Sequence, residues 1–227
     1  MGSSEPYHEG SRALQDRFDT RRLADRGAEL MFGPEPRIGA RERAFVERME
    51  MVFVGTADAD GVPHCSYKGG APGFVRVLDE RTLAIPDYDG NGFFDSWGNV
   101  AVNPHVDLLF IDFEADSPWR LRIKGTAVLE FDGPLLAAFH GAQLVVRITP
   151  TRIYPVCPRY VHQLRIVRRS RFVPAEDGAP APVAQWKLDA TEVPPELLAA
   201  GDPSRRESER LRDGGAPQPP THGPFPG

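Results

Sequence analysis

From position 51 onward, short apolar runs alternate with turn residues, a pattern typical of antiparallel β structure. Turns at Asp58–Gly61 and Asp79–Arg81 separate the first runs, and Asp and Gly there supply the hydrogen bonds and positive φ angles of hairpins. Gly125, inside a long run, marks a bulge or a close backbone approach. The predicted strands are 51–55, 62–68, 73–78, 82–86, 106–113, 119–131 and 143–154. So many short strands favour a barrel over a sandwich, because closure removes exposed edges.

Other segments have the apolar spacing of an α-helix. Residues 11–32 form an amphipathic pattern that predicts one helix or a pair of them, and a second short helix is predicted at 40–49. Further helices are predicted at 93–102 and 134–140. The dipeptide Asn103-Pro104 ends the third helix, because the residue before a proline is pushed out of the helical region.

The chain of 227 residues is long enough for one substantial domain with extensions at its ends. Eleven of the 23 prolines follow Phe172, so the compact part is expected to end near that position. We expect an N-terminal helical extension at 1–39, a core domain at 40–173, and a Pro/Gly-rich tail at 174–227 that is largely extended or mobile.

Charge and cysteine content narrow the possible partners. The formal net charge of −5 disfavours nucleic acid as a partner, because the phosphate backbone would be repelled. No apolar run is long enough for a membrane span and no signal peptide is visible, so we expect a cytoplasmic protein. Cys65 and Cys157 lie far apart without further ligands nearby, and we expect them to be buried, reduced thiols rather than a disulfide or a zinc site.

Two glycine-bearing loops each follow a strand end directly, at 66–73 and 86–92. Glycine lets a flat or phosphorylated ligand approach the main chain, and the second loop opens a helix whose free amides attract anions. On this interpretation, neutral donors around a phosphate come from Asn91, Ser96 and Asn99. Positive charge comes from Lys68 or from Arg120 and Arg122. The alternative is that both loops are ordinary connections rich in turn-forming residues.

No motif for hydrolysis, nucleotide binding or metal binding is present. His64 and Cys65 are neighbours on a predicted strand, so their side chains point to opposite faces and do not form a catalytic pair. His105 and His162 are isolated, and no metal is expected. An enzyme with these residues would take its reactivity from a cofactor.

Residues 53–113 and 121–129, with the motifs SYKGG, DYDGNG and NP, resemble the pyridoxamine 5'-phosphate oxidase-like, FMN-binding split-barrel family, in a bacterial branch of it. The similarity extends from about Tyr7, in the motif YHEG, through His162, in PVCPRYVH. The order of predicted elements agrees with it. The resemblance therefore implies a mainly β fold, an antiparallel split β-barrel with flanking helices, an N-terminal amphipathic helix and a Pro-rich C-terminal tail.

The resemblance also implies a homodimer with two FMN sites, each at the subunit interface. The second strand would lie along the flavin ring, residues 86–99 would hold the phosphate, and the long strand before Gly125 would reach the flavin of the neighbouring chain. By matching position, the implied cofactor residues are Ser66, Tyr67, Lys68, Gly69, Gly70, Pro86, Asp87, Tyr88, Asn91, Ser96, Asn99, Arg120 and Arg122. Where the oxidase itself has an Arg-Lys pair for the phosphate, this chain has Phe93, Phe94 and Asp95.

Our first hypothesis is an FMN-dependent oxidoreductase of unspecified substrate, with no catalytic residue assigned. The second is a binding protein that holds flavin or haem without turnover, and the third is a reductase that uses a deazaflavin. Trp186 could cover the cofactor cleft, or it could be an ordinary surface or packing aromatic.

Overall fold

The computed structural model describes residues 6–33, 35–175, 178–179, 181–189 and 192–215. Contacts within the chain divide it into two units, residues 1–169 and 170–227. The predicted limits of the extension, the core domain and the tail stay predictions, and parts of the first and last of these segments lie outside the described residues.

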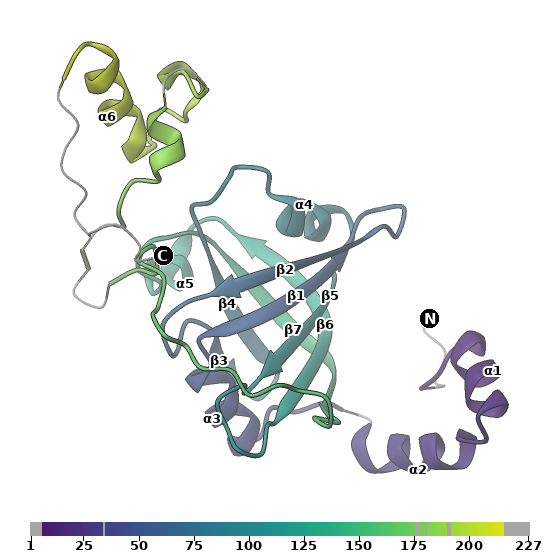
Figure 1. Ribbon diagram of the computed structural model, residues 1–227. Coiled ribbons are helices and arrows are strands. Elements are labelled where there is room, and N and C mark those ends of the chain that lie inside the picture. The colour runs from purple at the N-terminus through teal and green to yellow at the C-terminus, as the bar shows by residue number, and fades with distance from the viewer. Residues whose placement is uncertain (1–5, 34, 176–177, 180, 190–191, 216–227) are drawn as a thin grey trace. The chain divides into compact units, whose positions relative to one another are not determined.

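The first unit contains a seven-stranded antiparallel sheet that curls into a split barrel (Figure 1). Its strands are β1 (Met51–Ala57), β2 (Pro63–Gly69), β3 (Arg76–Asp79), β4 (Thr82–Tyr88), β5 (His105–Ile111), β6 (Arg120–Glu130) and β7 (Ala142–Val156). The strands follow the order β2-β1-β5-β6-β7-β4-β3, so β2 and β3 are the two edges of the sheet. The predicted mainly β, split-barrel fold is confirmed.

Alternation along the strands places one side of the sheet in the core. In β1, Val52 and Val54 are fully buried, while their neighbours are partly exposed. In β6 the same alternation buries Leu121 and Ile123, so that Arg120 and Arg122 face outward.

The first unit also contains helices, some of which pack on the barrel. They are α1 (Glu9–Arg17), α2 (Arg21–Met31), α3 (Ala40–Arg48), α4 (Asp95–Val102) and α5 (Gly133–Ala137). The predicted 11–32 helix is a pair, because Asp19 adopts a left-handed conformation (φ 51°) between α1 and α2. Likewise α4 begins at Asp95 rather than at Phe93, because Phe94 is left-handed (φ 54°).

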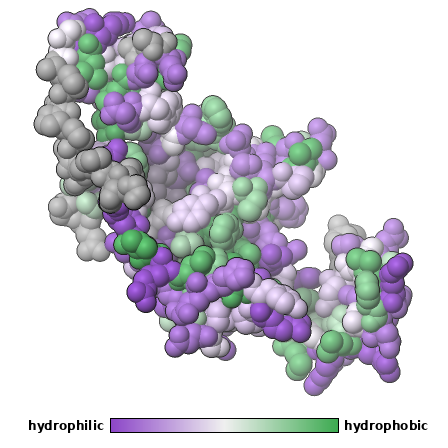
Figure 2. All heavy atoms as spheres, in the orientation of Figure 1, coloured by the Kyte–Doolittle hydropathy of each residue, from purple (hydrophilic) through white to green (hydrophobic). Residues whose placement is uncertain are grey.

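The N-terminal helix pair leaves much of its apolar side uncovered. Leu14, Phe18, Leu23 and Leu30 are each more than half exposed. Figure 2 shows hydrophobic side chains beside hydrophilic ones on this part of the molecule, at the lower right of the view. The helix pair is attached to β7 by Phe32, whose ring packs edge-on against Tyr154 at 5.1 Å between centroids. No helix in the described residues is long and apolar enough to cross a membrane.

The second unit contains two short 3-10 helices, η1 (Gln185–Leu188) and η2 (Pro195–Leu197), and the helix α6 (Pro203–Arg212). The sequence pattern did not indicate these helices. A buried ion pair links η1 to the start of α6, with Lys187 Nζ 2.8 Å from Asp202 Oδ2. Trp186 lies in η1 and is about half exposed (48%).

The prediction of buried thiols was wrong. Both cysteines are free, but both are exposed. Cys65 alternates with the inward-facing His64 and Ser66 on β2, so its side chain faces outward, and Cys157 comes directly after the last residue of β7.

Gly125 is confirmed as a bulge and a close approach. The pairing of β6 with β7 shifts register between Lys124 and Gly125, and a Cβ at position 125 would meet the carbonyl oxygen of Thr149 at 2.5 Å. We therefore expect Gly125→Ala to destabilise the fold by about 1–3 kcal/mol, because a main-chain oxygen cannot move aside cheaply. Thermal unfolding followed by circular dichroism measures this as a lower Tm.

The matched control is Gly98→Ala in α4, where a Cβ meets nothing within 4 Å. Alanine should stabilise that exposed helical position by about 0.5–1 kcal/mol. An unchanged Tm in Gly125→Ala would contradict the close approach.

Candidate functional site

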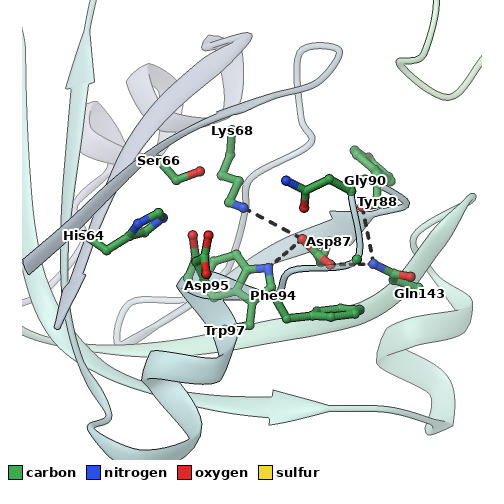
Figure 3. A pocket seen from close by; sticks show the side chains of 13 residues that line it. His64, Ser66, Lys68, Asp87, Tyr88, Gly90, Phe94, Asp95, Trp97 and Gln143 are labelled. Atoms are coloured by element: carbon green, nitrogen blue, oxygen red, sulfur yellow. Dashed lines mark hydrogen bonds and ion pairs between the residues drawn. The ribbon is translucent and has the colours of Figure 1, made fainter. Parts of the chain in front are cut away.

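A pocket of about 230 Å³ opens beside the edge strand β2 (Figure 3). Its walls come from β2, the end of β4, the following loop, the first turn of α4 and the start of β7. The side chains of His64, Ser66 and Lys68 all enter it, because their partners on β1 are Thr56, Val54 and Val52, which face the core. The other lining residues are Asp87, Tyr88, Gly90, Asn91, Gly92, Phe94, Asp95, Ser96, Trp97 and Gln143.

Asp87 is the central connection of the pocket. Its carboxylate accepts a 2.5 Å hydrogen bond from Trp97 Nε1 of α4 and a 2.8 Å hydrogen bond from Gln143 Nε2 of β7. Its Oδ1 atom also lies 4.0 Å from Lys68 Nζ of β2. A buried carboxylate needs such donors to compensate for lost water, so Asp87 ties three further elements to the end of β4.

Lys68 is the cation of the pocket. Its ammonium lies 4.9 Å from the centre of the Trp97 ring, a cation–π distance, and its side chain is 23% exposed. Burial lowers the pKa of Lys68 below its ordinary value, and the charge of Asp87 acts in the opposite direction. Nearby, burial raises the pKa of Tyr88, against the influence of Arg76.

The loop after β4 has an unusual backbone where it enters α4. Gly92 has a φ of 77°, which glycine adopts without strain, but Phe94 has a φ of 54°. For a bulky side chain that conformation costs about 1–3 kcal/mol, and such strain often occurs at functional sites. The amide of Phe93 donates to Asn91 Oδ1 at 3.1 Å, while Asp95 follows in the first turn and Ser96 is buried.

The structure brings together six of the residues expected from the sequence and separates the others. Those that line the pocket are Ser66, Lys68, Asp87, Tyr88, Asn91 and Ser96. Tyr67 and Gly69 lie on the outward side of β2, and Gly70 is packed against Phe74. Pro86 is buried in the pairing of β4 with β7, and Asn99 donates to Thr56 Oγ1 at 3.1 Å.

Arg120 and Arg122 lie on the outer face of β6, away from the pocket. Arg122 Nε is 3.4 Å from Asp107 Oδ1, and Lys124 Nζ is 3.7 Å from Asp107 Oδ2. Within the described residues, neither Arg122 Nε nor Asp107 Oδ1 has a hydrogen-bond partner, although both atoms are buried. Unsatisfied charged atoms of this kind require an explanation, such as a further partner.

Seven lining residues were not among the implied cofactor residues, namely His64, Gly90, Gly92, Phe94, Asp95, Trp97 and Gln143. Strand alternation could have found His64, because it shares a face with Ser66 and Lys68. Trp97 lies within the segment 86–99 implied for the phosphate but was not named, and nothing in the sequence pattern pointed to Gln143. The roles of both depend on the packing of α4 and β7 around Asp87.

The pocket is thus an open, partly aromatic space. It is lined by the ammonium of Lys68, the hydroxyl of Ser66, the imidazole of His64 and the hydrogen-bonded carboxylate of Asp87. In the described residues, no group of three or more His, Cys, Asp or Glu side chains could hold a metal ion. The ammonium of Lys68 can stabilise negative charge that develops on a bound molecule.

Comparisons with known proteins fit this architecture. The sequence model of the family described as pyridoxamine 5'-phosphate oxidase matches residues 38–157, more than half of the chain. No curated protein matches the sequence.

Several solved structures are similar to this chain. HupZ of Group A Streptococcus is 19% identical with a TM-score of 0.44, covering 56% of this chain and 99% of its own. The haem storage protein HutZ of Vibrio cholerae is 18% identical with a TM-score of 0.40, covering 52% and 94%. An FMN-binding protein of Syntrophomonas wolfei is 9% identical with a TM-score of 0.42, covering 63% and 97%. Similarity at this level says nothing about what this chain binds.

The opposing influences on Lys68 give a direct prediction. Replacing Asp87 by Asn removes the carboxylate charge that favours the ammonium, so the pKa of Lys68 should fall further below its ordinary value of about 10.4. Because only the neutral amine reacts with acetic anhydride, the labelling curve of Lys68 should shift to lower pH in Asp87→Asn.

Mass spectrometry after labelling at a series of pH values measures this shift. Lys124, exposed on β6, provides the reference curve in the same spectra. A Lys68 curve that stays in place or moves to higher pH would contradict the assigned coupling.

Proposed function

Because the chain belongs to the pyridoxamine 5'-phosphate oxidase family, we propose that it is an FMN-dependent oxidoreductase whose flavin binds in the pocket between β2, β4 and α4. The observation that carries this proposal is the gathering of Ser66, Lys68 and Asp87 with the start of α4 around one pocket. These residues come from separate segments, and the resemblance implied a flavin site in the same segments.

The residues of the pocket suit the ring end of a flavin. The polar edge of an isoalloxazine ring needs hydrogen-bond donors, and Lys68 Nζ and Ser66 Oγ enter the pocket from neighbouring positions on one strand. When bound, FMN would supply the redox chemistry by accepting and passing on a hydride or electrons.

The chain's own residues would bind and tune the cofactor. Lys68 would hold its proton at Nζ and stabilise negative charge on the reduced pyrimidine edge. Asp87 would keep that ammonium in place, and the hydrogen bonds from Trp97 and Gln143 would keep Asp87 in place. His64, in the same wall, is available to exchange a proton with a substrate.

We further propose a homodimer in which a second copy closes the pocket. Sites that enclose a small-molecule ligand span roughly 300–1,000 Å³, whereas this pocket measures about 230 Å³ and borders the unpaired edge of β2. The outer face next to that edge carries Phe53 and Tyr67, packed edge to face, and Tyr67 is 57% exposed. Such an apolar surface supports an interface between copies.

In that dimer, Arg120 and Arg122 of one copy would approach the flavin ring in the pocket of the other. Arg122 supports this role, because its Nε makes no hydrogen bond within the described residues and its ion pair with Asp107 Oδ1 is long, at 3.4 Å.

The first test is titration of the protein with FMN, followed by flavin fluorescence. We expect Lys68→Met to weaken binding by about tenfold or more, since a charge-assisted hydrogen bond is lost. Arg22→Met, which removes a 90% exposed cation on α2 outside the pocket, should bind like the parent protein. If all three proteins bound FMN with equal affinity, β2 would not be part of the flavin site.

Turnover is tested separately, with the FMN-loaded protein and NADPH or NADH under anaerobic conditions. Bleaching of the flavin and its return with an added electron acceptor would support the oxidoreductase. Tight binding without reduction by any donor would instead favour a protein that only holds flavin.

Mixing two variants that each weaken FMN binding tests the shared site. Lys68→Met damages the pocket, and Arg122→Ala damages the surface offered to the other copy. In a mixed dimer, one of the two sites receives an intact Lys68 and an intact Arg122. Refolding the variants together should therefore restore FMN binding at parental affinity in a fraction of the sites, and no restoration would contradict a site built from two chains.

A further inference from the structure

The charged side chains that line the pocket do not suit a phosphate group. Among the described residues that line it, Lys68 is the single ammonium or guanidinium, and the carboxylates are Asp87 and Asp95. Lys68 is already engaged by Asp87 and by the ring of Trp97. These side chains place two carboxylates against one ammonium in the pocket.

The end of the pocket at α4 is where an anion would be most expected, because a helix start presents free amides. In this chain the first turn of α4 carries a carboxylate of its own, that of Asp95, which adds negative charge beside those amides. The two preceding residues, Phe93 and Phe94, are exposed phenylalanines whose side chains offer no hydrogen-bond donor. A phosphate with a charge of about −1.5 to −2 would meet repulsion there.

Other charged groups near the start of α4 do not offset the negative charge of the pocket. Asp89, in the same loop, is a further exposed acid. Arg76 influences Tyr88 but does not line the pocket, and its guanidinium packs over the ring of Phe139 at 4.0 Å. The neutral donors Asn91 and Ser96 remain, while the main-chain amide of Phe93 already donates to Asn91 Oδ1 and is used within the loop.

We propose that this pocket recognises a flavin by its ring and not by its phosphate, so that riboflavin binds within a few-fold of FMN, and that Asp95 sets this selectivity. This inference rests on the proposed flavin site, and it adds which part of the flavin the pocket recognises. Lys68 and Ser66 would contact the ring, and a ribityl phosphate would come to the start of α4, where Phe94 and Asp95 line the pocket.

The experiment compares the dissociation constants of FMN and riboflavin, measured by fluorescence titration of the full chain. For the parent protein we expect the two constants to agree within roughly fivefold. In Asp95→Asn, FMN should bind about two- to fivefold more tightly, the size of one carboxylate effect at a helix start, while riboflavin should be unchanged. Asp132→Asn, the same change outside the pocket, should alter neither constant.

A second variant, Phe93→Arg, adds a guanidinium to the loop. It should raise the preference for FMN over riboflavin by roughly tenfold, since a charge-assisted pair with the phosphate becomes possible. Its circular dichroism spectrum and riboflavin affinity show whether the loop is intact, so a folding defect is recognised as such.

Each outcome bears on a different claim. If FMN binds the parent protein on the order of a hundredfold more tightly than riboflavin, or Asp95→Asn leaves FMN affinity unchanged, the inference is overturned while the flavin site stands. If neither flavin binds, the proposed function itself fails and the inference falls with it.

Discussion

The buried carboxylate of Asp87 holds the site together. It lies at the end of β4 and receives donors from α4 and β7, while the ammonium of β2 stands beside it. Without these partners, burying a charge at that position would be costly, so the carboxylate enforces the approach of all three elements. The shape of the pocket and the environment of Lys68 both follow from this one constraint.

The same constraint explains why the site is open. Asp87 gathers residues from one side of the barrel, but β2 is an edge strand and nothing within the sheet pairs with its outer edge. On the opposite face of the sheet, β6 carries arginines that cannot reach the pocket of their own chain. If two copies exchange these surfaces, the exchange accounts both for the open pocket and for an arginine whose Nε makes no hydrogen bond within the described residues.

Much of the fold could be predicted because apolar alternation is a local property of the sequence. It located all seven strands, and the glycine inside the sixth of them indicated the bulge. The left-handed Asp19 and Phe94, in contrast, moved helix limits in ways that composition does not signal. The exposure of Cys65 follows from strand alternation, but residue type alone suggested burial.

The site was less predictable for a physical reason. Ser66, Tyr67 and Lys68 were taken together as a run, yet a strand sends Tyr67 to the opposite face from its neighbours. Trp97 and Gln143 lie ten and 56 positions from the carboxylate they contact, and only tertiary packing brings them to it.

The most direct measurement is a crystal structure of the protein grown with FMN. The account predicts that the flavin ring lies against His64, Ser66 and Lys68 of one chain, with β6 of a second chain closing the pocket. A flavin bound elsewhere, or a pocket filled within a single isolated chain, would contradict it.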